Sequence, residues 1–142
     1  MKFILFFLTA LSLTLLCLAC KHPKYAADNL SEKQIRWGTG GGFVGKESAH
    51  ILCDNGQIFN RDIMGVTAAA GKTSGKKATV LFKTMADLGL SSMDFIHPGN
   101  TYSFLEFQEG DMVSRVVWGD KNSPVGKPVE ELFATLNGLL KK

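Results

Sequence analysis

The tripeptide Asp54-Asn55-Gly56 lies between two apolar stretches, and it constrains the fold more than any other feature of the chain. Asn-Gly steps favour the tight turns that join antiparallel strands, because these residues tolerate the backbone angles that such turns need. We therefore predict a strand over residues 43–53 and a partner strand over residues 57–63.

The periodicity changes after residues 64–76, a small-residue and Gly-rich stretch that predicts either a long loop or a ragged strand end. Apolar residues then recur at helical spacing, which predicts a helix over residues 77–88. Thr73 or Ser74 is placed to cap this helix, and Gly89 is placed to end it.

A second hairpin and a second helix follow in the same order. Residues 101–108 and 112–118 predict two strands joined by a turn, and residues 128–140 carry the apolar spacing of a helix. The order is hairpin, helix, hairpin, helix. It predicts an α+β fold, an antiparallel sheet of about four strands with two helices on one face.

The stretch GGGFVGKE at residues 40–47 fits the phosphate-binding loop G-x-x-x-x-G-K-[S/T] except at Glu47. A phosphate loop needs a hydroxyl at that position and a helix directly after the lysine. Glu47 repels phosphate, and the residues after it reach a turn too soon to form a standard helix. We therefore predict no nucleotide binding.

Glycines beside a strand instead permit a bulge, a tight bend or the close approach of another backbone. Trp37 and Phe43 flank these glycines and either pack over the exposed backbone or form a surface for a ligand or partner. Trp118, with Tyr102 and Phe104 in the preceding strand, is either core or part of the same kind of surface. The candidate binding surface comprises Trp37, Gly40, Gly41, Gly42, Phe43 and Trp118.

Candidate catalytic groups are few. His50 and Cys53 are three residues apart, which places them on opposite faces of a strand, and His50 and His97 lack the spacing of a metal pair. No serine lies in G-x-S-x-G. We predict no catalytic residue, no metal and no cofactor. The alternative is a hydrolytic or metal-dependent envelope enzyme whose site is assembled from distant residues.

The N-terminus has a separate role. Lys2 precedes an apolar run over residues 3–16, and the small residue Ala19 follows. This layout is typical of a secretory signal peptide, and the run is shorter than the roughly 20 residues of a spanning helix, so a retained anchor is the weaker interpretation. After residues 1–19 are removed, about 120 residues remain, enough for one domain with its own core.

Leu16-Cys17-Leu18-Ala19-Cys20 resembles the lipobox of bacterial lipoproteins, although Cys17 stands where a leucine is usual. The resemblance implies cleavage before Cys20 and lipidation of its thiol; the alternative is an ordinary signal peptide with Cys20 incidental. Residues 20–32 would then be a lipidated cysteine and tether, and residues 33–142 the domain. Lys21, under the sorting rule of enteric lipoproteins, implies the outer membrane, facing the periplasm.

The segments RWGTGGGFVG, HPGNTYSFLEF and SRVVWGD resemble a group of small lipoproteins of unassigned function from Bacteroidota, over roughly residues 35–140. This resemblance implies no particular activity. The net charge of +3 includes Lys2, and no clustered basic face indicates nucleic acid. We expect a membrane anchored, non-catalytic binding module whose partner is an envelope protein, a peptide or another envelope component.

Overall fold

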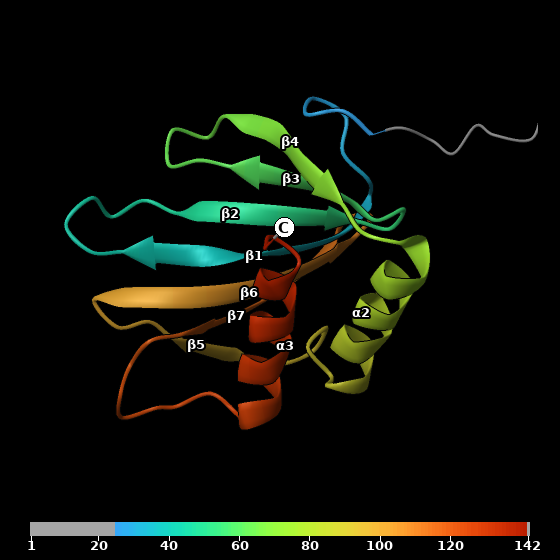
Figure 1. Cartoon of the computed structure of the whole chain (residues 1–142). Coiled ribbons are helices and arrows are strands. Elements are labelled where there is room, and N and C mark those ends of the chain that lie inside the picture. Colours follow the sequence, from blue (N-terminus) through green and yellow to red (C-terminus); the bar gives the residue numbers. More distant parts are fainter. Residues whose placement is uncertain (1–24, 142) are drawn as a thin grey trace, which may run out of the picture.

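One seven-stranded sheet and two helices make up residues 25–141, the part of the chain that the computed structural model describes (Figure 1). The predicted signal peptide (residues 1–19) and the lipidation site Cys20 lie outside the described residues. The elements in chain order are β1 (Lys33–Gly41), β2 (Ser48–Cys53), β3 (Gln57–Arg61), β4 (Thr67–Lys72), α2 (Gly75–Asp87), β5 (Phe95–His97), β6 (Thr101–Glu109), β7 (Met112–Trp118) and α3 (Lys127–Gly138).

The strand order is β4-β3-β2-β1-β6-β7-β5, and every neighbouring pair is antiparallel except β5 and β7, which run parallel. The predicted fold, an antiparallel sheet of about four strands with two helices on one face, is therefore wrong: the sheet has seven strands and is mixed. β4 consists of small residues without alternation, and β5 has only three residues, so neither carries a strand pattern.

β1 is a further strand that is not among the four predicted ones, and it continues through the glycines at its end. Gly38 explains why. A Cβ atom at this position would lie 2.0 Å from the backbone oxygen of Ser48 on β2, so only glycine fits between the two strands. The glycine that looks like a strand breaker therefore permits the strand pairing.

Both helices pack on the side of the sheet that carries Ile35 and Trp37 (Figure 1). Ser74 caps α2, since its hydroxyl accepts a hydrogen bond from the backbone N–H of Lys77, and Pro128 lies in the first turn of α3. The buried faces of the helices supply Ala78, Leu81, Phe82 and Met85 from α2, and Val129, Leu132 and Leu136 from α3.

The other side of the sheet is partly covered by the segment before β1. Tyr25 and Leu30 pack against Ile51, Cys53 and Phe59. The backbone N–H of Tyr25 also donates a 2.9 Å hydrogen bond to the side chain of Gln57. Residues 25–32 fall within the predicted tether, but the structure packs this part of it on the domain. In the described part of the chain, no helix is both long and apolar enough to cross a membrane.

Candidate functional site

The glycine-rich stretch ends in a tight turn between β1 and β2. The backbone N–H of Gly45 donates a 3.2 Å hydrogen bond to the oxygen of Gly42, and both glycines have positive φ angles, 62° and 67°. Phe43 and Val44 occupy the two corners of this turn. Phe43 has a relative exposure of 110%, so it contacts almost nothing in the protein.

The loop between β3 and β4 repeats this arrangement. The N–H of Gly65 donates a 2.9 Å hydrogen bond to the oxygen of Asp62, and Ile63 and Met64 occupy the corners. One carboxylate oxygen of Asp62 accepts the backbone N–H groups of Met64 at 2.8 Å and Val66 at 2.9 Å, which holds the loop in shape. The side chains of Ile63, Met64 and Val66 are all exposed.

The two turns are neighbours, because β2 and β3 pair directly, with Ala49 opposite Arg61. Figure 1 shows both loops at the same end of the sheet, and the ammonium of Lys46 lies 3.8 Å from the sulfur of Met64. We call this apolar feature the twin-turn tip; it consists of Phe43, Val44, Ile63, Met64 and Val66.

Turn corners usually carry Pro, Asp, Asn, Ser or Gly, because these residues suit the backbone and the solvent. The twin-turn tip carries large apolar side chains at all four corners. These side chains support no core, and clustered exposed apolar groups mark interaction sites. The tip is therefore the strongest candidate for an interaction surface on the described residues.

A cavity of about 540 Å³ lies directly behind the tip. Its basic side chains are Arg36, Lys46 and Arg61, and no salt bridge joins Lys46 or Arg61 to a carboxylate within residues 25–141. The tip is thus backed by two cations that have no carboxylate partner in the described part of the chain. The lining residues are Arg36, Lys46, Glu47, Ala49, Arg61, Asp62, Ile63, Met64 and Gly65.

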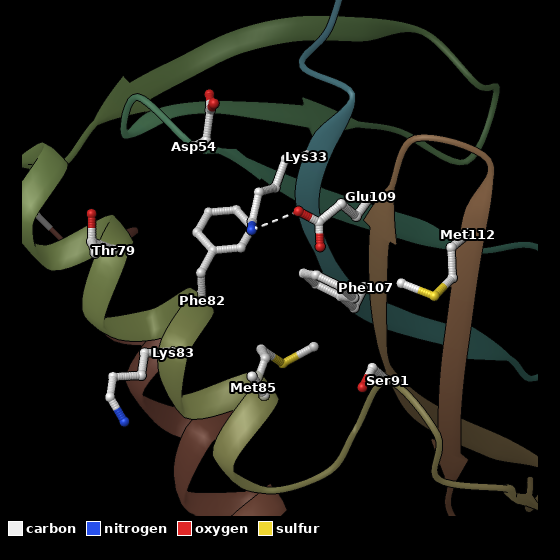
Figure 2. Close-up of a pocket in the computed structure, with 11 residues that line it drawn as sticks. Lys33, Asp54, Thr79, Phe82, Lys83, Met85, Ser91, Phe107, Glu109 and Met112 are labelled. Carbon is white, nitrogen blue, oxygen red and sulfur yellow. Dashed lines mark hydrogen bonds and ion pairs between the residues drawn. The ribbon is translucent and has the colours of Figure 1, made fainter.

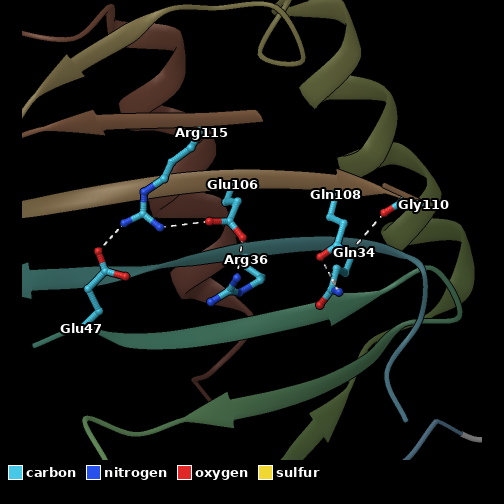
Figure 3. Close-up of polar contacts among 7 residues, drawn as sticks. All are labelled: Gln34, Arg36, Glu47, Glu106, Gln108, Gly110 and Arg115. Carbon is cyan, nitrogen blue, oxygen red and sulfur yellow. Dashed lines mark hydrogen bonds and ion pairs between the residues drawn. The ribbon is translucent and has the colours of Figure 1, made fainter. Parts of the chain in front are cut away.

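A chain of alternating charges crosses the sheet beside this cavity (Figure 3). Glu106 accepts from Arg36 at 2.5 Å and from Arg115 at 2.9 Å, and Arg115 also binds Glu47. Arg36, Glu106 and Arg115 stand directly opposite one another on β1, β6 and β7, where cross-strand pairs interact best.

Glu47, the residue that breaks the phosphate-loop pattern, is occupied in this network. Its carboxylate accepts the hydroxyl of Tyr102 at 2.9 Å in addition to the guanidinium of Arg115. The hydrogen bond to Glu47 raises the pKa of the Tyr102 hydroxyl. Glu47 therefore fastens the base of the β1–β2 loop to β6 and β7, and is already neutralised by an arginine.

A second cavity, of about 470 Å³, lies between α2 and the opposite end of the sheet (Figure 2). The ammonium of Lys33 forms a 2.8 Å ion pair with Glu109, and it lies 5.7 Å from the ring centre of Phe82 and 6.0 Å from that of Phe107. The lining is Lys33, Asp54, Thr79, Phe82, Lys83, Met85, Ala86, Ser91, Phe107, Glu109 and Met112. The Thr79 hydroxyl in this lining donates to the backbone oxygen of Gly75 at 3.0 Å and not to a charged side chain.

The structure does not bring the residues of the predicted candidate surface together on one exposed face. Trp37 has no exposed surface and lies in the core, so its predicted place on a binding surface is corrected. Trp118 packs edge-on against Phe133, with 5.1 Å between the ring centres, and is half-buried. An aromatic side chain on a strand is drawn into the core when its face meets the helices, which sequence alternation alone cannot decide.

Of the predicted surface residues, Gly40, Gly41 and Gly42 allow other parts of the chain to approach the end of β1 closely. A Cβ at Gly40 would lie 2.7 Å from the ring of Tyr102, and Gly42 donates its N–H to the oxygen of Asn100 at 2.6 Å. Phe43 alone of the predicted set is fully exposed. The sequence reasoning missed the rest of the tip, although G-F-V-G and D-I-M-G both place an apolar pair before a turn glycine.

Replacing Gly41 by valine is expected to lower the free energy of unfolding by about 1–3 kcal/mol, the usual cost of a strained backbone. Gly41 has a φ of +84°, and its Cβ would lie 2.3 Å from the oxygen of Asn100. Urea unfolding checks this, with Gly75→Ala as control, because nothing lies within 4 Å of a Cβ at Gly75. An unchanged midpoint for Gly41→Val would show that the loop needs no glycine there.

Within residues 25–141, His50, His97 and Cys53 make contacts of a structural kind. The Nδ1 atom of His50 lies 2.5 Å from the side-chain oxygen of Asn60, and the ring of His97 packs 4.6 Å from that of Phe95. Burial raises the pKa of the Cys53 thiol, which therefore stays protonated and unreactive. Among residues 25–141, no three His, Cys, Asp or Glu side chains are grouped so that they could hold a metal ion.

Comparison with models of known protein families finds no match, and comparison with curated proteins finds none either.

Proposed function

We propose that this chain is a lipid-anchored, non-catalytic binding module of the bacterial cell envelope, and that the twin-turn tip is its contact surface. The observation that carries the proposal is the presence of exposed apolar side chains at all four corners of two neighbouring turns. Such side chains cost solubility and contribute nothing to the core, so a binding role is the simplest physical reason for them.

The position of the tip supports this proposal. Tyr25 contacts Gln57 where β3 begins, whereas the two turns follow β1 and β3 at the other end of the sheet. β1 has nine residues, and a strand rises about 3.3 Å per residue, so the sheet separates the two ends by roughly 30 Å.

Lipidation at Cys20 would keep the N-terminal end of the domain close to the membrane. Residues 21–24 span at most about 3.6 Å each. A domain that stands upright on such an anchor presents the tip away from its own membrane. This orientation suits a module of the outer membrane that reaches into the periplasm for its partner.

Crosslinking in intact cells tests the proposal. A photoreactive amino acid in place of Phe43 or Met64 is expected to capture one envelope component reproducibly. The same group in place of Lys83, an exposed residue on α2, is the matched control and should capture nothing specific. Equal capture from the tip and from α2, or no capture from the tip, would contradict a binding role for the tip.

A further inference from the structure

We propose that the twin-turn tip inserts into an anionic lipid surface. This inference rests on the proposed function and names the class of partner that the tip contacts. It draws on three features of the described residues: the shape of the tip, the charges behind it and the end of the domain at which it lies.

The shape of the tip is convex. Phe43 and Met64 are turn corners with relative exposures of 110% and 72%, and the two turns protrude from neighbouring strand ends. A folded protein partner would need a matched cavity for each protruding side chain. The interfacial region of a bilayer, by contrast, accepts protruding apolar groups of any outline and buries them without a preformed cavity.

The charges behind the tip match anionic headgroups. Lys46 directly follows the first turn, Arg61 directly precedes the second, and neither has a carboxylate partner within residues 25–141. Of the nearby acids, Glu47 binds Arg115, while Asp62 accepts two backbone N–H groups of its own loop and forms no salt bridge with Lys46 or Arg61. Apolar corners in front of two free cations give the layered pattern that binds acidic lipid.

The position of the tip at the end of the sheet away from Tyr25 favours a second membrane, rather than the membrane that holds the anchor, as the source of this surface. An upright domain would reach a second membrane, while a domain lying on its side would bring the tip to the membrane that holds its own anchor. Both sources present the same chemistry. The two are told apart by mixing vesicles that carry the lipidated chain with bare anionic vesicles. Clustering in light scattering indicates a second membrane, and tip insertion without clustering indicates the same membrane.

Binding is tested with the mature chain, residues 20–142, carrying Cys20→Ser, so that no lipid anchor contributes. We expect this chain to cosediment with vesicles of about 30 mol% phosphatidylglycerol but only weakly with pure phosphatidylcholine, and to dissociate as salt screens the cations. Phe43→Ser with Ile63→Ser should weaken binding by about tenfold or more, since apolar burial supplies most of the affinity.

Two further double variants sharpen the test. Lys46→Gln with Arg61→Gln should weaken binding several-fold and remove its salt dependence, whereas Val80→Ser with Lys83→Gln on the exposed face of α2 should change nothing. Wild-type binding by the Phe43→Ser and Ile63→Ser variant would overturn the inference.

The experiments can refute the lipid inference without refuting the proposed binding function. If the crosslinker at Phe43 captures a protein in cells and the mature chain ignores anionic vesicles, the binding module stands and the lipid inference is wrong. If the tip captures nothing in cells and ignores vesicles, both are wrong.

Discussion

Replacing Trp37 by alanine is expected to lower the free energy of unfolding by about 3–5 kcal/mol, the range measured when a large buried aromatic side chain is removed. Trp37 has no exposed surface and packs in the core beneath both helices. Its Nε1 also donates a 3.1 Å hydrogen bond to the side-chain oxygen of Asn137, so α3 loses a polar contact as well as apolar packing. Urea unfolding followed by circular dichroism measures the change.

The milder variant Trp37→Phe keeps this test usable if the alanine variant does not fold. It retains most of the apolar volume and removes the indole donor, so an intermediate loss of stability is expected. Wild-type stability for Trp37→Ala together with loss of partner capture would contradict the account. That result would return Trp37 to the binding surface that the sequence predicts.

Glu106→Ala is expected to lower the free energy of unfolding by about 2–4 kcal/mol, because removing one partner leaves buried or half-buried charges without compensation. The Glu106 side chain is only 7% exposed and binds Arg36 and Arg115 at once. Without it, two guanidinium groups face each other across β6. The mechanism is therefore repulsion and desolvation rather than the loss of one contact.

Glu109→Ala is the matched control, since Glu109 lies on the same strand and pairs with Lys33 at 2.8 Å. Its side chain is 49% exposed, and exposed ion pairs contribute roughly 0–1 kcal/mol. A loss at Glu106 no larger than that at Glu109 would mean that the charge chain across the sheet is not structural.

Much of the local structure could be predicted from the sequence. The hairpin at Asp54-Asn55-Gly56 is confirmed, although its first strand begins at Ser48 and not at residue 43. Both helices, the Ser74 cap and the hairpin of β6 and β7 are also confirmed. These elements could be predicted because the residues that form them are close in the chain and their apolar residues recur at a clear spacing. The predicted sheet of about four strands was wrong because β4 and β5 lack a period and β1 runs through several glycines.

The pairing of strands that are far apart in the chain could not be predicted from the sequence either. β1 joins the two halves of the sheet by pairing with β6, about 70 residues away in the chain, and no local pattern specifies that partner. The same limit applies to Trp37 and Glu106. Alternation relates the faces of residues within one strand, but only the pairing of β1 with β6 places Trp37 and Glu106 on opposite faces of one sheet.

The candidate site could be found in part. Phe43 follows the glycines and was predicted at a surface, whereas Ile63 and Met64 were assigned to a strand end and a flexible loop. Ile63 and Met64 lie near Phe43 because β2 pairs with β3, and this pairing brings the two turns together. The unusual apolar residues at the turn corners can be seen in the sequence of each turn alone. That they form one surface is seen only when the two turns are brought together.

The central claim is that the twin-turn tip exists for binding and not for stability. The most direct test replaces its four corner residues with residues common at turns, as Phe43→Ser, Val44→Asn, Ile63→Ser and Met64→Asn, and measures unfolding and in-cell capture on the same variant. We predict that the free energy of unfolding changes by no more than about 0.5 kcal/mol for each replacement, as at other surface sites, while capture by a crosslinker at position 66 is lost. Marked destabilisation, or undiminished capture by the stable variant, would contradict the claim.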